Sequence, residues 1–141
     1  PQGDPGPPGA PGAATGGGGY EFAGLSDESV VCHDGFDNLR RACAAVFENG
    51  RVCRSADYLH TAEPVAFAEP AFILPSAYPV GTGAQHQIMD VTGVNMFVGD
   101  STCYGWTAVG GNHFMLFPGG SFRIRGTDRN PFRVACCIPA Q

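Results

Sequence analysis

Six cysteines are the most reactive residues of this chain. They are Cys32, Cys43, Cys53, Cys103, Cys136 and Cys137. No two of them have the C-x-x-C spacing that is typical of a zinc site, so the pattern favours disulfide bonds. If all six serve structural bridges, none is left to act as a catalytic nucleophile.

The other candidates for chemistry give no catalytic pattern. Four histidines, His33, His60, His86 and His113, are scattered without H-x-x-x-H or H-E-x-x-H spacing. G-x-S-x-G, Walker and dinucleotide fingerprints are also missing from the sequence. The segment from Asp34 to Asn38 offers two carboxylates and a carboxamide for a hard cation, but a turn followed by a helix N-cap is the favoured interpretation. We therefore predict no enzyme activity, no cofactor and no metal.

The charges are unevenly distributed along the chain. Residues 1–100 contain twelve acids and four arginines, whereas residues 101–141 contain one acid and four arginines, and there is no lysine. This split predicts either neutralisation within one fold or complementary faces on neighbouring protomers. Duplex nucleic acid is not an expected partner of so acidic a chain. The predicted interface combines aromatics with the late arginines: Tyr104, Trp106, Arg123, Arg125, Arg129 and Arg133.

The sequence predicts two helices and several strands, which must position the cysteines and the predicted interface residues. Apolar residues at three- and four-residue spacing predict a helix within 36–50, with Asp37 as N-cap and Gly50 as the stop. A second short helix is expected from Ser55, as its cap, to a break at Pro64. Alternation predicts strands at 121–125 and 132–139, with further strands within 88–100 and 112–120. The predicted fold class is α+β with a mainly antiparallel sheet.

The last strand restricts the disulfide pairing. Phe132, Val134, Cys136 and Ile138 face one way, and Arg133, Ala135 and Cys137 face the other. Cys136 and Cys137 should therefore find separate partners, and a bridge between them is only a minor alternative.

The first twelve residues contain a glycine repeat with a period of three. Gly3, Gly6, Gly9 and Gly12 recur with proline between them, which is the signature of a collagen triple helix because only glycine fits at its axis. The alternative is a flexible Pro/Gly linker that happens to keep phase. Twelve residues span roughly 37 Å at ~3.1 Å per residue, so such a stalk needs help from the head or from further triplets to stay wound.

The chain is accordingly divided into three parts. Residues 1–12 form the collagen-like segment, 13–19 a Gly-rich hinge, and 20–141 one globular head. No apolar run approaches membrane-spanning length. A collagen-like segment with six cysteines indicates an oxidising compartment, so we expect a secreted, extracellular or cell-surface protein.

The head resembles the C-type-lectin-like fold, closest to its endostatin branch. The resemblance rests on the helix with Cys43, on Cys103 and Trp106, and on the last strand ending in V-x-C-C-I. It implies a Cys43–Cys137 bridge; Cys136 would then substitute as the partner of Cys103, leaving Cys32 with Cys53. The E-P-N or Q-P-D triplet of the family's calcium-dependent sugar site is missing. A trimeric jelly-roll head is a further alternative, which the helix and the cysteine density disfavour.

Two functions follow from these observations. The first is an extracellular structural protein, a homotrimer or higher polymer whose heads assemble or decorate surface filaments. The second is a trimeric lectin-like binding module, which would hold a surface polysaccharide or a cell-surface receptor through the avidity of three weak sites.

Overall fold

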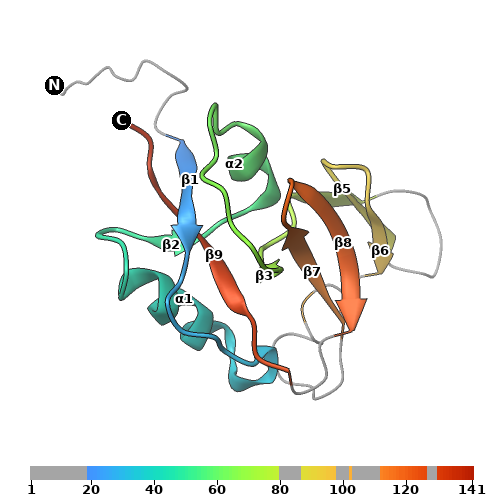
Figure 1. Ribbon diagram of the computed structural model, residues 1–141. Helices are drawn as coiled ribbons and strands as arrows, with labels where there is room; N and C mark the ends of the chain where they lie inside the picture. Colours follow the sequence, from blue (N-terminus) through green and yellow to red (C-terminus); the bar gives the residue numbers. More distant parts are fainter. Residues whose placement is uncertain (1–18, 80–86, 98–101, 103–111, 127–129) are drawn as a thin grey trace, which may run out of the picture.

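The computed structural model describes residues 19–79, 87–97, 102, 112–126 and 130–141 (Figure 1). These residues form a mixed α+β fold that is mainly sheet, as predicted. The collagen-like segment with Gly3, Gly6, Gly9 and Gly12 lies outside the described residues, as does the hinge before Gly19.

The last strand, β9 (Arg133–Pro139), is the centre of a six-stranded sheet. β1 (Tyr20–Leu25) runs antiparallel along one edge of β9, and β2 (Arg51–Val52) pairs antiparallel with the other edge. The two-residue β3 (Ala71–Phe72) runs parallel to the start of β9. The four residues from Val134 to Cys137 are fully buried, because a strand flanked by partners in a sheet covered on both faces has no exposed side.

A hairpin completes the sheet. β7 (Asn112–Phe117) pairs antiparallel with β3, and β8 (Ser121–Gly126) pairs with β7 to form the edge opposite β1. Gly119 and Gly120 in the connecting turn have φ values of 91° and 90°, a conformation that favours glycine. The strands predicted within 112–120 and 121–125 are confirmed.

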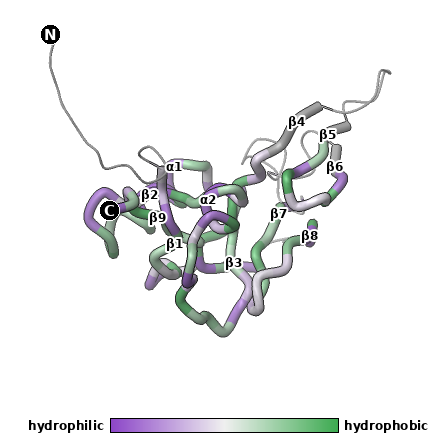
Figure 2. Tube along the Cα trace, turned by 90° about the horizontal axis from the view of Figure 1, so that it is seen from above, coloured by the Kyte–Doolittle hydropathy of each residue, from purple (hydrophilic) through white to green (hydrophobic). Residues whose placement is uncertain are grey.

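A second, smaller sheet lies beside the hairpin in both views (Figures 1 and 2). It consists of β4 (Ala77–Pro79), β5 (Gln87–Asp90) and β6 (Asn95–Phe97), all antiparallel. β5 and β6 are the strands predicted within 88–100, separated by a turn in which Gly93 has φ of 92°.

The helices are shorter than predicted. A 3-10 turn, η1 (Cys32–Asp34), precedes α1 (Phe36–Ala44), and Gly35, with φ of 103°, occupies the N-cap position. The prediction that Asp37 caps this helix is wrong, because Asp37 already lies in its first turn. The chain leaves α1 through turns closed on the Cys43 carbonyl and reaches Gly50, where a Cβ would lie 2.7 Å from that oxygen.

The second helix, α2 (Ser55–Leu59), also differs from the prediction. It ends five residues before Pro64, and Arg54 rather than Ser55 is its N-cap residue. Ser55 is fully buried and its hydroxyl donates to the carboxylate of Asp90 at 2.8 Å. A serine that is committed to a buried carboxylate is not available to cap its own helix.

The two faces of the six-stranded sheet carry separate apolar clusters. Green, hydrophobic stretches mark β9 and β7 in Figure 2. One cluster contains Phe22, Cys53, Tyr58, Ala71, Ile73, Phe114, Leu116, Ala135 and Cys137. The other contains Cys32, Leu39, Ala42, Cys43, Val52, Phe72, Met115, Val134 and Cys136, and is the face on which α1 packs.

Among the described residues, a disulfide fastens each face of the sheet. Cys43 of α1 is bonded to Cys136, and Cys53, just before α2, is bonded to Cys137. The two neighbouring cysteines of β9 do take separate partners, as the alternation predicts. The bridges implied by the family resemblance, Cys43–Cys137, Cys103–Cys136 and Cys32–Cys53, are wrong. Alternation places Cys136, not Cys137, on the face that α1 covers, so Cys43 can reach only Cys136.

Cys32 is also disulfide-bonded, while Cys103 lies outside the described residues. The described bridges close loops with sequence separations of 93 and 84 residues. In the chain-entropy model, closing a loop of this length stabilises the folded state by about 4 to 5 kcal/mol. The helices and the C-terminal strand therefore form one covalently fastened unit.

Candidate functional site

The arginines predicted as an interface do not form one surface. Arg123 and Arg125 lie together on β8 and are exposed, on the sheet face that carries Met115 and Phe72. Arg133 points to the opposite face and pairs with Glu69 at 3.6 Å. Tyr104, Trp106 and Arg129 lie outside the described residues. Of the predicted interface residues, the structure thus brings together Arg123 and Arg125 on β8.

Aromatic rings hold both arginines of this pair. The Arg123 guanidinium carbon lies 4.0 Å from the ring centroid of Phe117, and that of Arg125 lies 5.2 Å from the ring of Phe132. A guanidinium over an aromatic face is attracted by the ring quadrupole and keeps its donors directed outward. We call Arg123, Arg125, Phe117 and Phe132 the arginine edge.

The arginine edge borders a hollow of about 350 Å³ lined by Phe117, Arg123, Ile124 and Arg125. Residues 112–126 contain no acid, and neither arginine makes an ion pair within the part of the chain that the structure describes. The guanidinium groups are therefore suited to carboxylate, sulfate or phosphate groups, which arginine binds through two parallel hydrogen bonds.

A buried histidine lies on the same face of the sheet. His113 is opposite Arg125 in the β7–β8 register, is completely buried, and its ring centroid is 4.7 Å from that of Phe72. Burial lowers the pKa of His113 to about 4, although its Nδ1 lies 2.6 Å from the carbonyl oxygen of Phe114. The imidazole is therefore neutral at neutral pH and packs against Phe72 inside the fold.

A buried carboxylate joins β5 of the smaller sheet to α2 and to the segment before β4. Asp90, at the end of β5, is 1% exposed and accepts hydrogen bonds from the hydroxyls of Ser55 and Thr92, at 2.8 and 2.6 Å. It also accepts from the backbone N–H groups of Ser76 and Thr92, at 2.6 and 2.9 Å. Four donors compensate the burial of this charge. Sequence analysis missed this cluster, because its members are spread over 38 residues.

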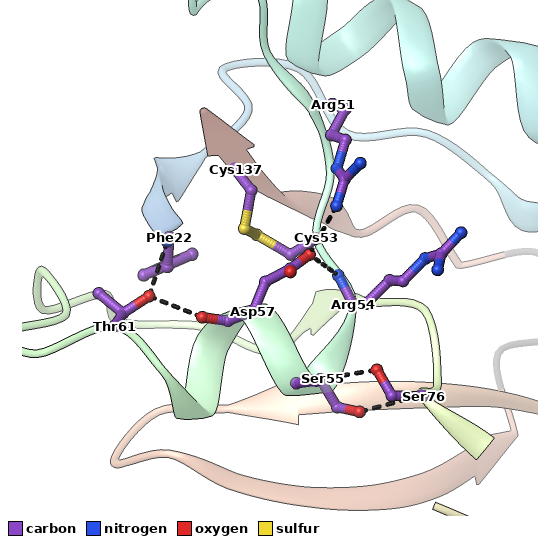
Figure 3. Close-up of polar contacts among 10 residues, drawn as sticks. Phe22, Arg51, Cys53, Arg54, Ser55, Asp57, Thr61, Ser76 and Cys137 are labelled. Carbon is purple, nitrogen blue, oxygen red and sulfur yellow. Dashed lines mark hydrogen bonds and ion pairs between the residues drawn. A yellow bond between two sulfur atoms is a disulfide. The ribbon is translucent and has the colours of Figure 1, made fainter. Parts of the chain in front are cut away.

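Close to the start of the head, another polar network fixes α2 (Figure 3). Asp57 accepts from Arg51 at 3.2 Å and from the backbone N–H of Arg54 at 3.1 Å. The hydroxyl of Thr61 donates to the Asp57 carbonyl and accepts from the N–H of Phe22, both at 2.8 Å. Arg51 also lies over the ring of Tyr20, 3.4 Å from its centroid. This network connects β1, the first strand of the described residues, to α2.

The segment considered for a hard cation is used for ion pairs. Asp37 binds Arg40 at 2.6 Å and Arg41 at 2.8 Å, and the Arg40 hydrogen bond is the main cause of its lowered pKa. The Asn38 amide donates to the Asp34 carbonyl at 3.1 Å. Within the described ranges, no group of three or more His, Cys, Asp or Glu side chains could hold a metal ion.

Comparisons with protein-family models, with curated proteins and with solved structures found no match for this chain. Across the described parts of the chain, no helix has the length and apolar character needed to cross a membrane. The assignment of function therefore depends on the residues themselves.

Proposed function

We propose that this chain is an extracellular structural protein in which a collagen-like stalk gathers three chains and the heads assemble or decorate surface filaments. The observation that carries the proposal is the glycine repeat at Gly3, Gly6, Gly9 and Gly12. Two disulfides in the head fit an oxidising compartment.

The way the head is fastened to its first strand supports a structural role. Gly19 accepts a hydrogen bond from the N–H of Ala140 at 2.9 Å, and β1 then pairs with β9 from Tyr20 onward. β9 is in turn bonded to Cys43 and Cys53. A load applied through the stalk would thus pass from β1 into a disulfide-fastened strand rather than into a loop.

Charge supports contact between heads. Arg123 and Arg125 of the arginine edge lie on β8, the edge strand at the other end of the sheet from β1. Asp27 and Glu28 are exposed, form no ion pair among the described residues, and line a hollow of about 450 Å³ next to α1. Arg41 also lines this hollow but is held by Asp37. Opposite charges on different surfaces favour head-to-tail contacts, which close into rings or extend into fibres.

A second candidate is a lectin-like binding module. The head keeps one general feature of that resemblance, a disulfide between a helix and the last strand, although Cys136 rather than Cys137 is the partner of Cys43. The arginine edge favours binding, because its guanidinium groups are exposed and held by aromatic rings. Three heads on one stalk would add avidity for a surface polysaccharide or receptor.

Electron microscopy of the purified full-length chain separates the two candidates. We expect regular fibres from the structural protein, whereas discrete bouquets of three heads with signal on a glycan array would support the binding module. A monomer in sedimentation, without fibres or glycan signal, would contradict both.

The role of the arginine edge is tested by reversing its charge. Arg123→Glu with Arg125→Glu should abolish fibres, because contacts with acidic surfaces become repulsive. Arg54→Glu with Arg133→Glu makes the same change of net charge away from this edge and should leave the fibres intact. Equal loss with both pairs would show that total charge, not the arginine edge, controls assembly.

A further inference from the structure

Residues 62–68, between α2 and β3, form an exposed segment without regular structure. All but Phe67 are exposed, and Val65 retains 48% of its accessible surface. In the described part of the molecule, no backbone group of this segment makes a hydrogen bond. The residues on either side are held, since Thr61 bonds to Phe22 and Asp57, and Glu69 pairs with Arg133. The segment is therefore an irregular strap that is fixed at both ends and packed on the core through the ring of Phe67.

Another exposed valine shows what is special about the strap. Val91 retains 49% of its surface, almost the same as Val65. However, Val91 lies in the turn after β5, and its N–H donates to the Ser76 carbonyl at 3.1 Å. The N–H groups of Thr92 and Gly93 are also bonded, both to Asp90. A protease binds its substrate as an extended chain, so Val91 must first break these bonds whereas Val65 need not.

The strap's sequence determines which class of protease could use it. No lysine or arginine occurs between Arg54 and Arg123, so an enzyme of trypsin-like specificity has no site there. Val65 is flanked by alanines at 62, 66 and 68 and preceded by Pro64, which keeps Glu63 extended. A small aliphatic residue before the cleaved bond fits the small S1 pocket of elastase-type serine proteases.

Both described disulfides join the two sides of the strap. Cys43 and Cys53 precede it, and their partners Cys136 and Cys137 follow it. The pairing of β1 and β2 with β9 likewise joins the two sides. A cut in the strap would therefore leave two chains in one folded, covalently linked head.

We propose that the strap is a processing site for an extracellular elastase-type serine protease, and that the cleaved head persists as two disulfide-linked chains. The reaction is hydrolysis of the Val65–Ala66 peptide bond. Water supplies the hydroxyl of the new carboxylate on Val65, and the amine of Ala66 takes the remaining proton as a new N-terminus. This inference does not depend on the assembly proposed above.

Brief digestion of the folded full-length chain with pancreatic elastase tests the proposal. We expect mass spectrometry of the reduced sample to find fragments ending at Val65 and beginning at Ala66. These fragments should stay joined until reductant is added. Cleavage after Val65 should be faster than after Val91 by at least about tenfold, since two or three net hydrogen bonds protect the turn. Trypsin should leave residues 55–122 intact.

Two matched variants identify the bond. Val65→Asp should abolish the 65–66 cut, because the small apolar S1 pocket excludes a carboxylate, while Val91→Asp should leave that cut unchanged. Both positions are exposed, and unchanged thermal unfolding would show that both variants fold. The proposal is overturned if the Val65–Ala66 bond survives while other bonds of the chain are cut. It is equally overturned if Val91 is cut as fast as Val65, or if the fragments separate without reductant.

Discussion

At the scale of single residues, His113 makes the folded state sensitive to acid. Burial lowers the pKa of His113 from 6.5 to about 4, so the unfolded chain takes up a proton at a higher pH than the folded chain does. His113 therefore contributes about 3 kcal/mol to the free energy of unfolding above about pH 6.5, and this contribution is lost as the pH falls toward 4.

Urea denaturation at pH 7.5, 5.5 and 4.5 measures this effect. His113→Phe should flatten the decline in the free energy of unfolding between pH 6.5 and 4, because phenylalanine has no proton to gain. His60→Gln, at an exposed position, is the control and should keep the wild-type decline. An unchanged decline in His113→Phe would assign the acid sensitivity to other groups.

Asp90 is the residue on which the second sheet depends. Asp90→Ala removes the acceptor for Ser55, Ser76 and Thr92, and we expect a loss of about 3 to 5 kcal/mol in the free energy of unfolding. Asp37→Ala removes two ion pairs at the surface instead and should cost no more than about 1 kcal/mol. Similar losses from both variants, measured by urea denaturation, would contradict this role.

Single residues also show where sequence reasoning stops. Alternation along 132–139 correctly separates Cys136 from Cys137, because side-chain direction is a local property of a strand. Which of the two meets α1 depends on the face that the helix covers, and this is decided by packing between segments far apart in the chain. Asp90 was missed for the same reason, since its donors come from three separate positions, Ser55, Ser76 and Thr92.

At the scale of elements, the two disulfides assign one helical region to each face of β9. Tryptic mapping of the wild-type chain should give residues 42–51, 52–54 and 134–141 in one linked cluster, because no tryptic site separates Cys136 from Cys137. Cys43→Ala with Cys136→Ala should leave residues 52–54 linked to 134–141. Peptide 52–54 released free from that variant would show that Cys53 is not bonded to Cys137.

Several elements could be predicted and others could not. The strands within 112–126 and 132–139 have clear alternation or turn glycines, and both helices were predicted in the right segments although each cap was misplaced. The helix lengths were overestimated, because α1 is followed by turns closed on the Cys43 carbonyl and α2 by a turn closed on the Tyr58 carbonyl. β2 and β3 have two residues each, too few for any periodicity to appear. They form because β9 pairs with β2, and β9 and β7 pair with β3.

At the scale of the whole molecule, the glycine repeat predicts the trimer that we propose above. Gly6→Ala with Gly9→Ala should convert the trimer to a monomer in sedimentation, because a methyl group does not fit at the axis of a triple helix. The thermal unfolding of the head should be unchanged, since the two apolar clusters of the described residues begin at Phe22. Ala10→Ser, at a position away from the axis, should remain trimeric; a trimer that survives both glycine substitutions would place trimerisation in the heads.

The closeness of Gly19 and Ala140 has a practical consequence for anyone who builds on this molecule. A fluorescent label or fused cargo attached after Gln141 would sit beside the entry of the polypeptide into the head, on the β1 side. It would leave the opposite border, with Arg123 and Arg125, uncovered. Attachment after Gln141 is thus a suitable way to immobilise the protein with its arginine edge exposed.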